Sequence, residues 1–253
     1  MNAMLERQHV EVFHLLFLAQ LGRKMDKRFC TLKGGCNLRF FFRSPRYSED
    51  MDLDVTEVPV HKVEAIVSGI LKSKPFEQIL QVRGIRIEHI NNDKQTETTQ
   101  RWKLGLSLPR AERPVPTKIE FSRRGVDDDG RFEAVDPLLT AGYELPAIMT
   151  NHYLARSALK QKIQALADRR ETQARDIFDF DILLNAGAVP DNLPEETRSK
   201  LRTARENALL LDFDVFRSQV VAYLPMDDQA AYDEDVWDAM RLRVCEALEK
   251  VTP

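Results

Sequence analysis

Cysteine is scarce in this chain of 253 residues, and the few cysteines do not form a recognisable site. Cys30, Cys36 and Cys245 are an odd number, and none stands in a CxxC pair or in the Cys/His spacing of a zinc site. The five histidines are scattered singly. We therefore expect no disulfide framework and no structural zinc, and a reducing setting in which the thiols serve as small apolar residues.

Long hydrophobic runs are also missing. No apolar segment reaches the roughly 18 residues that a membrane-spanning helix needs. The start, Met1–Arg7, lacks the basic-then-apolar pattern of a signal peptide. These absences predict a cytoplasmic globular protein without a membrane partner.

Neither sign of charge dominates the sequence. Lys and Arg number 37 against 40 Asp and Glu, which gives a net charge of -3, so no global basic field indicates nucleic-acid binding. A local basic groove remains compatible with this balance. The 43% hydrophobic and 30% charged residues exclude a disordered or collagen-like chain and favour one or two packed domains.

The first part of the chain alternates between helical and strand-like patterns. Helices are predicted at about 5–21, 36–42 and 61–72, where apolar residues recur at helical spacing. Strand-like segments are predicted at 29–32, 51–55, 79–90, 99–108 and 115–121. Turns or loops are predicted at Lys33-Gly34-Gly35, at 91–93 and at 127–130.

The pattern changes after about Pro146, where strand-like segments give way to helices. Helical periodicity predicts helices at roughly 149–168, 174–186, 195–208, 212–223 and 230–248. The fold class expected is therefore α+β: a domain with a mixed sheet over 1–145, followed by an all-helical C-terminal domain over 146–253.

The segment that carries chemistry is Leu32-Lys33-Gly34-Gly35 and, fourteen residues later, Asp50-Met51-Asp52-Leu53-Asp54. A Gly-Gly turn between a strand and a helix lets a phosphate approach the backbone and the free N–H groups of the helix start. Asp50, Asp52 and Asp54 alternate along a strand and share one face. Carboxylates crowded on one face favour a divalent cation between them, with Mg²⁺ or Mn²⁺ preferred by hard oxygen ligands.

Two other readings of this segment fail on spacing. An EF-hand loop beginning at Asp50 needs Gly at its sixth place and Glu at its twelfth, and those places hold Val55 and His61. A P-loop needs Gly-Lys-Ser/Thr at a spacing that is missing here. Asp-x-Asp alone is weak evidence, because the spacing recurs at Asp127/Asp129, Asp179/Asp181, Asp212/Asp214 and Asp233/Asp235. The preceding Gly-Gly turn distinguishes the first pair, and Asp54 is left outside the catalytic set.

At these residues the sequence resembles the polymerase-β-type nucleotidyltransferases, and most closely the AbiEii/AbiGii toxin group. Leu32–Arg39 (LKGGCNLR) and Arg46–Leu53 (RYSEDMDL) are similar to that group's LKGGTALRL and R-aromatic-SEDxD, with Cys36-Asn37 in place of Thr-Ala. Lys118–Ser122 (KIEFS) resembles the element that carries the third carboxylate, which puts Glu120 opposite the aspartates. Lys162–Leu166 and Arg175–Phe180 resemble the helical motif. The resemblance covers about residues 30–185 and leaves out the last sixty or so.

The resemblance implies a polymerase-β-like nucleotidyltransferase domain and a role for each matching residue. Catalytic residues would be Asp50, Asp52, Glu120 and Lys162, of which Asp50, Asp52 and Glu120 would bind Mg²⁺ (or Mn²⁺). Nucleotide-binding residues would be Lys33, Gly34, Gly35, Arg39, Ser48 and Asp179. Such phosphoryl chemistry needs positioning and charge neutralisation more than a covalent nucleophile.

The function implied is transfer of a nucleoside monophosphate from an NTP to an acceptor hydroxyl. The resemblance suggests a toxin of a toxin–antitoxin pair, with tRNA or other RNA as acceptor and a cognate antitoxin as partner. An RNA acceptor predicts a basic stripe, for which Arg39, Arg43, Arg46, Arg123 and Arg124 are candidates. Two alternatives stay open: nucleotidylation of a protein or small molecule, and a nucleotide-binding module without catalysis.

Overall fold

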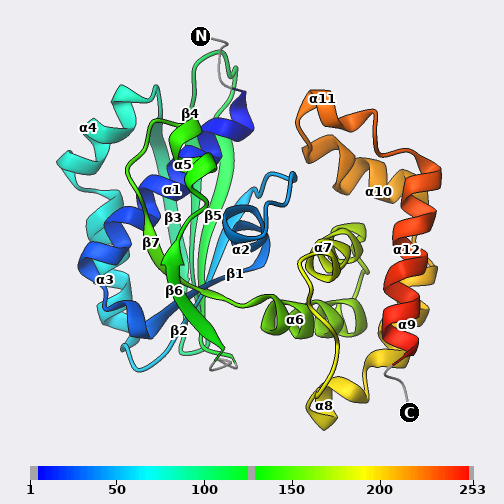
Figure 1. Cartoon of the computed structure of the whole chain (residues 1–253). Coiled ribbons are helices and arrows are strands. Elements are labelled where there is room, and N and C mark those ends of the chain that lie inside the picture. The colour runs from blue at the N-terminus through cyan, green and yellow to red at the C-terminus, as the bar shows by residue number, and fades with distance from the viewer. Residues whose placement is uncertain (1–4, 125–128, 251–253) are drawn as a thin grey trace. The chain divides into compact units, whose positions relative to one another are not determined.

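A computed structural model of the chain describes residues 5–124 and 129–250 (Figure 1). These residues divide into two compact units. The first unit holds 5–41 and 47–152 without the gap, and the second holds 42–46 and 153–250. The domain boundary predicted after residue 145 stays a prediction.

The first unit is built on a sheet of seven strands in the order β3-β4-β5-β2-β1-β7-β6. The two central pairings differ in direction, because β2 runs antiparallel to β1 and parallel to β5. The sheet is therefore mixed, as predicted. The strands are β1 (Cys30–Lys33), β2 (Asp50–Val55), β3 (Arg86–Gln95), β4 (Thr99–Ser107), β5 (Val115–Ser122), β6 (Gly130–Ala134) and β7 (Met149–Tyr153).

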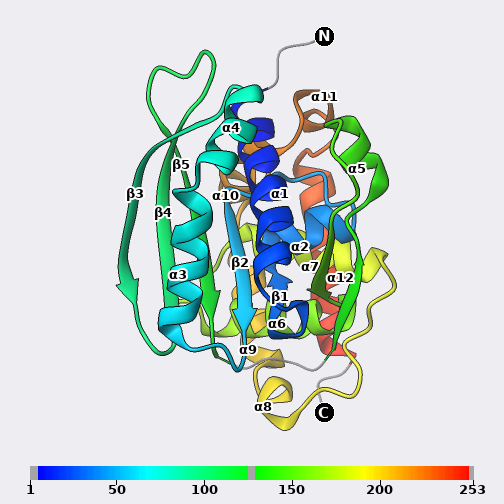
Figure 2. The same ribbon diagram turned by 90° about the vertical axis from the view of Figure 1, so that its left-hand side faces the viewer.

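Helices cover the two faces of this sheet unequally (Figure 2). One face is covered by α1 (Glu6–Lys24), α3 (Val60–Leu71) and α4 (Lys74–Val82). On the other face α2 (Gly34–Phe41) lies against β1 and β2. A short helix, α5 (Pro137–Gly142), follows β6. The main core forms between the first face and its helices, since buried apolar residues of α1 and α3 pack with Trp102 and Phe121, which meet edge to face at 5.8 Å.

The second unit is helical throughout its described residues after β7. Phe216 and Trp237 stack at 4.5 Å in its core, and Phe178 and Tyr232 pack beside them. The helices are α6 (Ala155–Asp168), α7 (Ala174–Asn185), α8 (Glu195–Arg198), α9 (Leu201–Leu209), α10 (Phe213–Gln219), α11 (Met226–Gln229) and α12 (Glu234–Glu249), with short 3₁₀ turns at Val221–Tyr223 and, in the first unit, at Lys27–Phe29.

Several predicted elements were wrong for identifiable reasons. Residues 79–82 belong to helix α4 rather than to a strand, because Ser73 caps a new helix by accepting from the N–H of Phe76, and Pro75 sits in its first turn instead of ending the previous one. Residues 91–93 lie within β3. The predicted helix at 149–168 begins with β7, which pairs with β1 through His152 and Leu32.

Smaller differences concern segments with weak local patterns. Gly130 opens β6 rather than closing a loop, and residues 127–128 of that predicted loop lie outside the described residues. The long C-terminal helices predicted at 195–208 and 212–223 are each interrupted, and α12 begins at Glu234 after an Asp233 cap. The three cysteines are buried and free, as expected for small apolar residues.

Candidate active site

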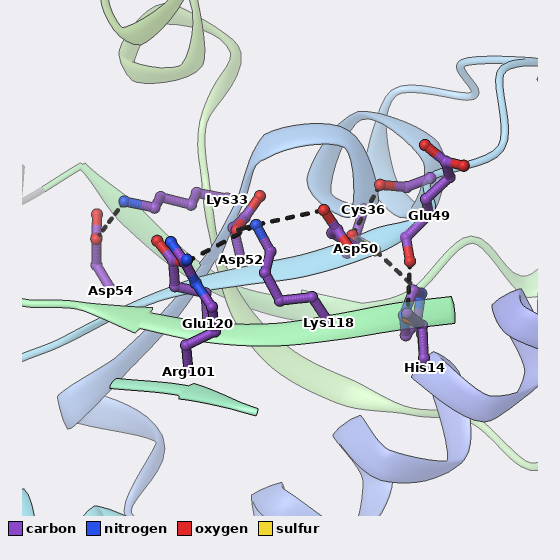
Figure 3. Close-up of polar contacts among 12 residues, drawn as sticks. His14, Lys33, Cys36, Glu49, Asp50, Asp52, Asp54, Arg101, Lys118 and Glu120 are labelled. Atoms are coloured by element: carbon purple, nitrogen blue, oxygen red, sulfur yellow. Dashed lines mark hydrogen bonds and ion pairs between the residues drawn. The ribbon is translucent and has the colours of Figure 1, made fainter. Parts of the chain in front are cut away.

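The carboxylates predicted from the sequence meet on two neighbouring strands (Figure 3). Asp50 and Asp52 lie on β2, and the parallel register with β5 places Glu120 directly opposite Asp52. Their side chains are 39%, 33% and 20% exposed, respectively. The predicted position of Glu120 is therefore confirmed, and three carboxylates face the same accessible side of the sheet.

The ammonium group of Lys118 stands among these carboxylates. Lys118 lies directly opposite Asp50, and its Nζ is 3.3 Å from Oδ2 of Asp50, 3.7 Å from Oδ1 of Asp52 and 3.8 Å from Oε2 of Glu120 (Figure 3). We call these four residues the acidic cluster. No motif indicated that Lys118, within KIEFS, would stand among the carboxylates. The period of two on a strand does place it on the same face as Glu120.

The pKa values reflect this crowding. Desolvation, followed by the neighbouring Asp50 and Glu120, raises the pKa of Asp52 against the opposing effect of Lys118. Burial opposes the charge of Lys118, yet Asp52, Asp50 and Glu120 together raise the pKa of its ammonium. The cluster thus combines excess negative charge with a single shared cation.

Further ion pairs border the acidic cluster on both sides. Arg101 on β4 donates from Nε to Oε2 of Glu120 at 2.5 Å. Lys33, at the end of β1, donates from Nζ to Oδ1 of the buried Asp54 at 2.6 Å. Asp54 is thereby neutralised by a neighbour of its own, which supports leaving it outside the catalytic set, and Lys33 is held beside the cluster.

At the predicted Gly-Gly turn, α2 follows β1 directly, without an intervening loop. Gly34 begins the helix with a positive φ of 67°, a conformation that L side chains rarely adopt. A Cβ added at Gly34 would stand 3.2 Å from Oδ2 of Asp52. Glycine is therefore needed both for the turn and for the close approach of the helix start to the acidic cluster.

Hydrogen bonds from the covered face hold the beginning of β2. The hydroxyl of Thr117 on β5 donates to the carbonyl of Glu49 at 2.7 Å, so its oxygen is left to accept from Nε2 of His14 on α1, 2.8 Å away. Burial lowers the pKa of His14 to about 3, so its ring is neutral. The carbonyl of Asp50 accepts from the Cys36 thiol at 3.2 Å and from the Ser48 hydroxyl at 2.8 Å.

These contacts identify positioning residues that sequence analysis did not assign. Neither His14 nor Thr117 stands in a sequence motif that indicates such a role, because both meet β2 only through the tertiary fold. Ser48 was predicted to bind nucleotide, and the structure places its hydroxyl on the backbone of Asp50. Its contact with a nucleotide stays a prediction.

Arg39 contacts α1 and Tyr47 within the first unit. Its Nε donates at 2.6 Å to Glu11 of α1, which is 2% exposed and also accepts from the hydroxyl of Tyr143 at 2.5 Å. The guanidinium lies over the ring of Tyr47, 4.6 Å from its centroid. This network ties α2 to α1, and a role for Arg39 in nucleotide binding stays a prediction.

The second unit contains its own charged cluster. Lys162 on α6 donates at 2.9 Å to Asp176 and at 2.6 Å to Asp179, both on α7. Arg46 contacts both oxygens of Asp179 at 3.2 Å, and Arg169 contacts Asp176 at 2.7 Å. We call these five residues the buried cluster, since the two aspartates are 0% and 1% exposed.

Lys162 and Asp179, both predicted site residues, belong to the buried cluster. The structure brings the two residues together, and Lys162 is buried rather than a solvated surface lysine. Arg46 and Lys162 hold the pKa of Asp179 below its usual range despite burial. The catalytic role of Lys162 and the nucleotide contact of Asp179 stay predictions.

The arginines expected to form a basic stripe have different surroundings. Arg39 and Arg46 take part in the networks just described. Arg123 donates to the carbonyl of Val58 and to the side chain of Gln100, and Gln100 in turn contacts the start of α3 on the helix-covered face. These three are bound to protein groups, whereas Arg43 and Arg124 are exposed, and a role of the five in binding RNA stays a prediction.

The acidic cluster is suited to a divalent cation by the chemistry of its donors. Carboxylate oxygens on adjacent strands surround one positive charge, and such oxygens are the ligands that Mg²⁺ and Mn²⁺ prefer. Over residues 5–124 and 129–250, no three His, Cys, Asp or Glu side chains stand close enough to form a ready-made metal site. A cation bound by these carboxylates would compete with the Lys118 ammonium, whose Nζ lies 3.3 to 3.8 Å from them.

Comparison with known proteins defines the class. The sequence profile of the AbiEii family, described as nucleotidyl transferase AbiEii toxin of type IV toxin–antitoxin systems, matches residues 16–250. This chain belongs to that family, and it is a nucleotidyltransferase. The match extends beyond the 30–185 seen from motifs and corrects the expectation that the last sixty or so residues carry no resemblance. No curated protein sequence matches the chain.

Solved structures share the fold at low sequence identity. A Helicobacter pylori protein assigned provisionally as a nucleotidyltransferase is 17% identical with a TM-score of 0.61, covering 98% of this chain and 99% of that one. JHP933 from Helicobacter pylori is 17% identical with a TM-score of 0.58, covering 98% and 96%. MenT4, a nucleotidyltransferase toxin from Mycobacterium tuberculosis, is 16% identical with a TM-score of 0.58, covering 96% and 92%. The predicted fold class is confirmed.

The helices of the described residues include none that is long and apolar enough to cross a membrane.

Proposed function

We propose that this protein transfers a nucleoside monophosphate from an NTP to a hydroxyl of an RNA, with tRNA as the first candidate, and that it does so as the toxin of a toxin–antitoxin pair in the cytoplasm. The observation that carries the proposal is the convergence of Asp50, Asp52 and Glu120 on one cation beside Gly34. A cognate antitoxin is the proposed partner.

In the proposed reaction an acceptor oxygen bonds to the α-phosphorus, the bond from that phosphorus to the bridging oxygen breaks, and pyrophosphate leaves. Asp50, Asp52 and Glu120 would bind Mg²⁺ or Mn²⁺, which when bound lowers the pKa of the acceptor hydroxyl and neutralises the phosphates. Gly34 and Gly35 would present backbone N–H groups to the triphosphate, with Lys33 beside them. The ammonium of Lys118 would neutralise phosphate charge after a cation has displaced it from the carboxylates.

Placement of the cluster on rigid strands supports this assignment. The parallel register of β2 and β5 fixes the spacing of Asp52 and Glu120, and the His14–Thr117–Glu49 contacts hold the start of β2 from beneath. Phosphoryl transfer depends on positioning and charge neutralisation, and a preorganised set of carboxylates provides both. No nucleophilic side chain of the protein is required.

The test uses each α-labelled NTP with Mg²⁺, total RNA and a cell lysate, and resolves the products by size. We expect label in a tRNA-sized band with wild type and its loss with Asp50→Ala. The control is Asp191→Asn, which removes a carboxylate from an exposed position of the second unit. Full activity of Asp50→Ala would contradict the assigned site.

Other outcomes of this experiment distinguish the remaining functions. Label in protein, lost with Asp50→Ala, would keep the active site and replace RNA by a protein acceptor. NTP binding that is unaffected by removal of Mg²⁺, without any label transferred, would indicate a binding module instead of an enzyme.

A further inference from the structure

The acidic cluster is continuous with a positively charged part of the same sheet face. In the register of the sheet, Asp52 lies opposite Glu120, Glu120 opposite Arg101 on β4, and Arg101 opposite Lys94 on β3. Residues directly opposite each other in a ladder project to the same side. One row of side chains therefore runs across four strands, from the carboxylate of Asp52 to the lysine of Lys94.

A second row runs parallel to the first. Asp50 lies opposite Lys118, Lys118 opposite Lys103 on β4, and Lys103 opposite Asn91 on β3. Both rows begin with an aspartate of the acidic cluster and carry a basic residue on β4, and the first row also ends in a lysine on β3. We call Lys94, Arg101 and Lys103 the basic surface.

Lys94 and Lys103 lie outside the ion pairs of the acidic cluster. Lys94 lies opposite Arg101 and Lys103 opposite Lys118, and these two partners already contact carboxylates. Lys94 and Lys103 are exposed, and neither makes an ion pair or a side-chain hydrogen bond with any residue that the structure describes. Their positive charge beside the proposed active site is therefore available to a polyanionic ligand.

A β-bulge keeps Lys94 on this face. Lys94 and Asn91 are three residues apart on β3, whereas their partners Arg101 and Lys103 are two apart on β4, and the register shifts between the two pairs. Without the extra residue, the alternation of the strand would turn Lys94 to the helix-covered side. The bulge thus directs a lysine toward the accessible side.

The basic surface lies on the opposite flank of the acidic cluster from Gly34. In the strand order, β1 and Gly34 follow β2 on one side, and β5, β4 and β3 follow it on the other. Lys94 is three strand spacings from Asp52, on the order of 14 Å. The glycines and the basic surface thus lie on opposite flanks of the acidic cluster, so a triphosphate held by Gly34 and Gly35 and a polyanion held by the basic surface would use different groups.

We infer that Lys94 and Lys103, with Arg101 between them and the acidic cluster, form the surface that binds the phosphate backbone of the RNA acceptor. The inference rests on the proposed function and adds the direction of approach: the NTP enters from the β1 side and the RNA from the β3–β4 side. Binding of this kind depends on charge and is independent of sequence, which suits an acceptor recognised near its end.

The test compares wild type with the double variant Lys94→Gln/Lys103→Gln, using total tRNA as the acceptor probe. We expect the KM for tRNA to rise about tenfold, and the slope of log(1/KM) against log salt to become shallower by about two. The KM for NTP stays unchanged, and activity recovers at saturating tRNA. Thermal stability stays close to that of wild type, because both lysines are exposed and make no ion pair with a described residue.

The matched control is Lys62→Gln/Lys74→Gln, which removes two exposed lysines from α3 and α4 on the opposite face. It should behave as wild type, since an effect of net charge alone would appear in both variants. An unchanged KM for tRNA in the first double variant, or equal effects in the two, would overturn the inference. A raised KM for NTP would reassign the basic surface to the triphosphate.

The same experiment separates failure of this inference from failure of the proposed function. If wild type labels tRNA and the double variant labels it equally well, the basic surface alone is refuted. If wild type labels no RNA and labels protein instead, the RNA acceptor itself is refuted, and the inference falls with it.

Discussion

The two charged clusters of this protein contain the same kinds of side chain in different surroundings. In the acidic cluster the aspartates are 33% and 39% exposed, and Lys118 is no closer than 3.3 Å to any of the carboxylates. In the buried cluster the aspartates are at most 1% exposed, and Lys162 approaches them to 2.6 and 2.9 Å. Burial and distance thus separate an exchangeable cation from a structural one.

This difference follows from the energetics of ion pairs. Exposed pairs contribute little because water and salt compete for both partners, so a ligand can replace one of them at small cost. Removing one partner of a buried pair leaves an uncompensated charge in a medium of low dielectric. We therefore expect the cation of the acidic cluster to be the more easily replaced, and the buried cluster to stabilise the packing of α6, α7 and the segment around Arg46.

The largest expected effect is on stability and concerns the buried cluster. Asp179→Asn should lower the free energy of unfolding by about 3–5 kcal/mol, because Lys162 and Arg46 lose their shared carboxylate. Asp52→Asn, the matched change in the acidic cluster, should leave stability unchanged or increased while abolishing transfer. Denaturant unfolding of both variants measures the contrast, and equal destabilisation would remove the distinction drawn between the clusters.

Lys118→Met removes the cation that lies among the carboxylates of the acidic cluster and so tests how this cluster differs from the buried one. Without this ammonium, Mg²⁺ should bind the free enzyme about tenfold more tightly, because the cation that lies among Asp50, Asp52 and Glu120 no longer competes for them. NTP binding should weaken in the same variant. Calorimetric titration of the enzyme with Mg²⁺ alone measures the first effect.

The control for this prediction is Lys103→Met, which removes an equal charge from the neighbouring position opposite Lys118. A long-range effect of charge would change Mg²⁺ affinity in both variants alike. Weaker Mg²⁺ binding by Lys118→Met would contradict the competition between ammonium and metal.

The two clusters should depend on pH with opposite signs. The pKa of Asp52 is raised in the fold, first by desolvation, so its ionised form destabilises the protein above that pKa, and this cost disappears as the pH falls through it. The pKa of Asp179 is lowered in the fold by Arg46 and Lys162 despite burial. Its stabilisation is complete above the ordinary aspartate pKa, about 3.9, and is lost as the pH falls through the lowered value.

The free energy of unfolding, measured from pH 7 down to acid pH in the presence of a metal chelator, tests this contrast. The free-energy difference between wild type and Asp52→Asn should favour the variant at pH 7 and vanish in acid. The difference between wild type and Asp179→Asn should favour wild type at pH 7 and shrink only below about pH 4. The same sign for both differences would contradict the assigned environments.

The smallest expected effect comes from the support beneath the acidic cluster. Thr117→Val removes the hydroxyl that hydrogen-bonds both to the buried ring of His14 and to the carbonyl of Glu49, and should cost about 1–3 kcal/mol of stability. Displacement of β2 should lower kcat several-fold with little change in the KM for NTP. Thr117→Ser, which restores the hydroxyl, should recover kcat, and failure of this rescue would limit Thr117 to a packing role.

Much of the first unit could be predicted because its signals are local. The alternation of Asp50 and Asp52, the glycines after a short apolar run, and the helical spacing of α1 are all properties of neighbouring residues. The strand–helix unit at Gly34 appeared as expected. Elements without such a pattern were missed: β7 exists because it pairs with β1, and α4 because Ser73 caps it.

The sequence by itself determined the α+β class, the aspartate pair and the glycines before it, because these depend on spacing along the chain, and its motifs carried the resemblance to the family. Only the tertiary structure decided which strand lies beside β2, and with it the place of Lys118 among the carboxylates and of Thr117 and His14 beneath them. Strand order and register are set by burying apolar faces from distant segments, and a shift of one residue would turn each side chain to the opposite face.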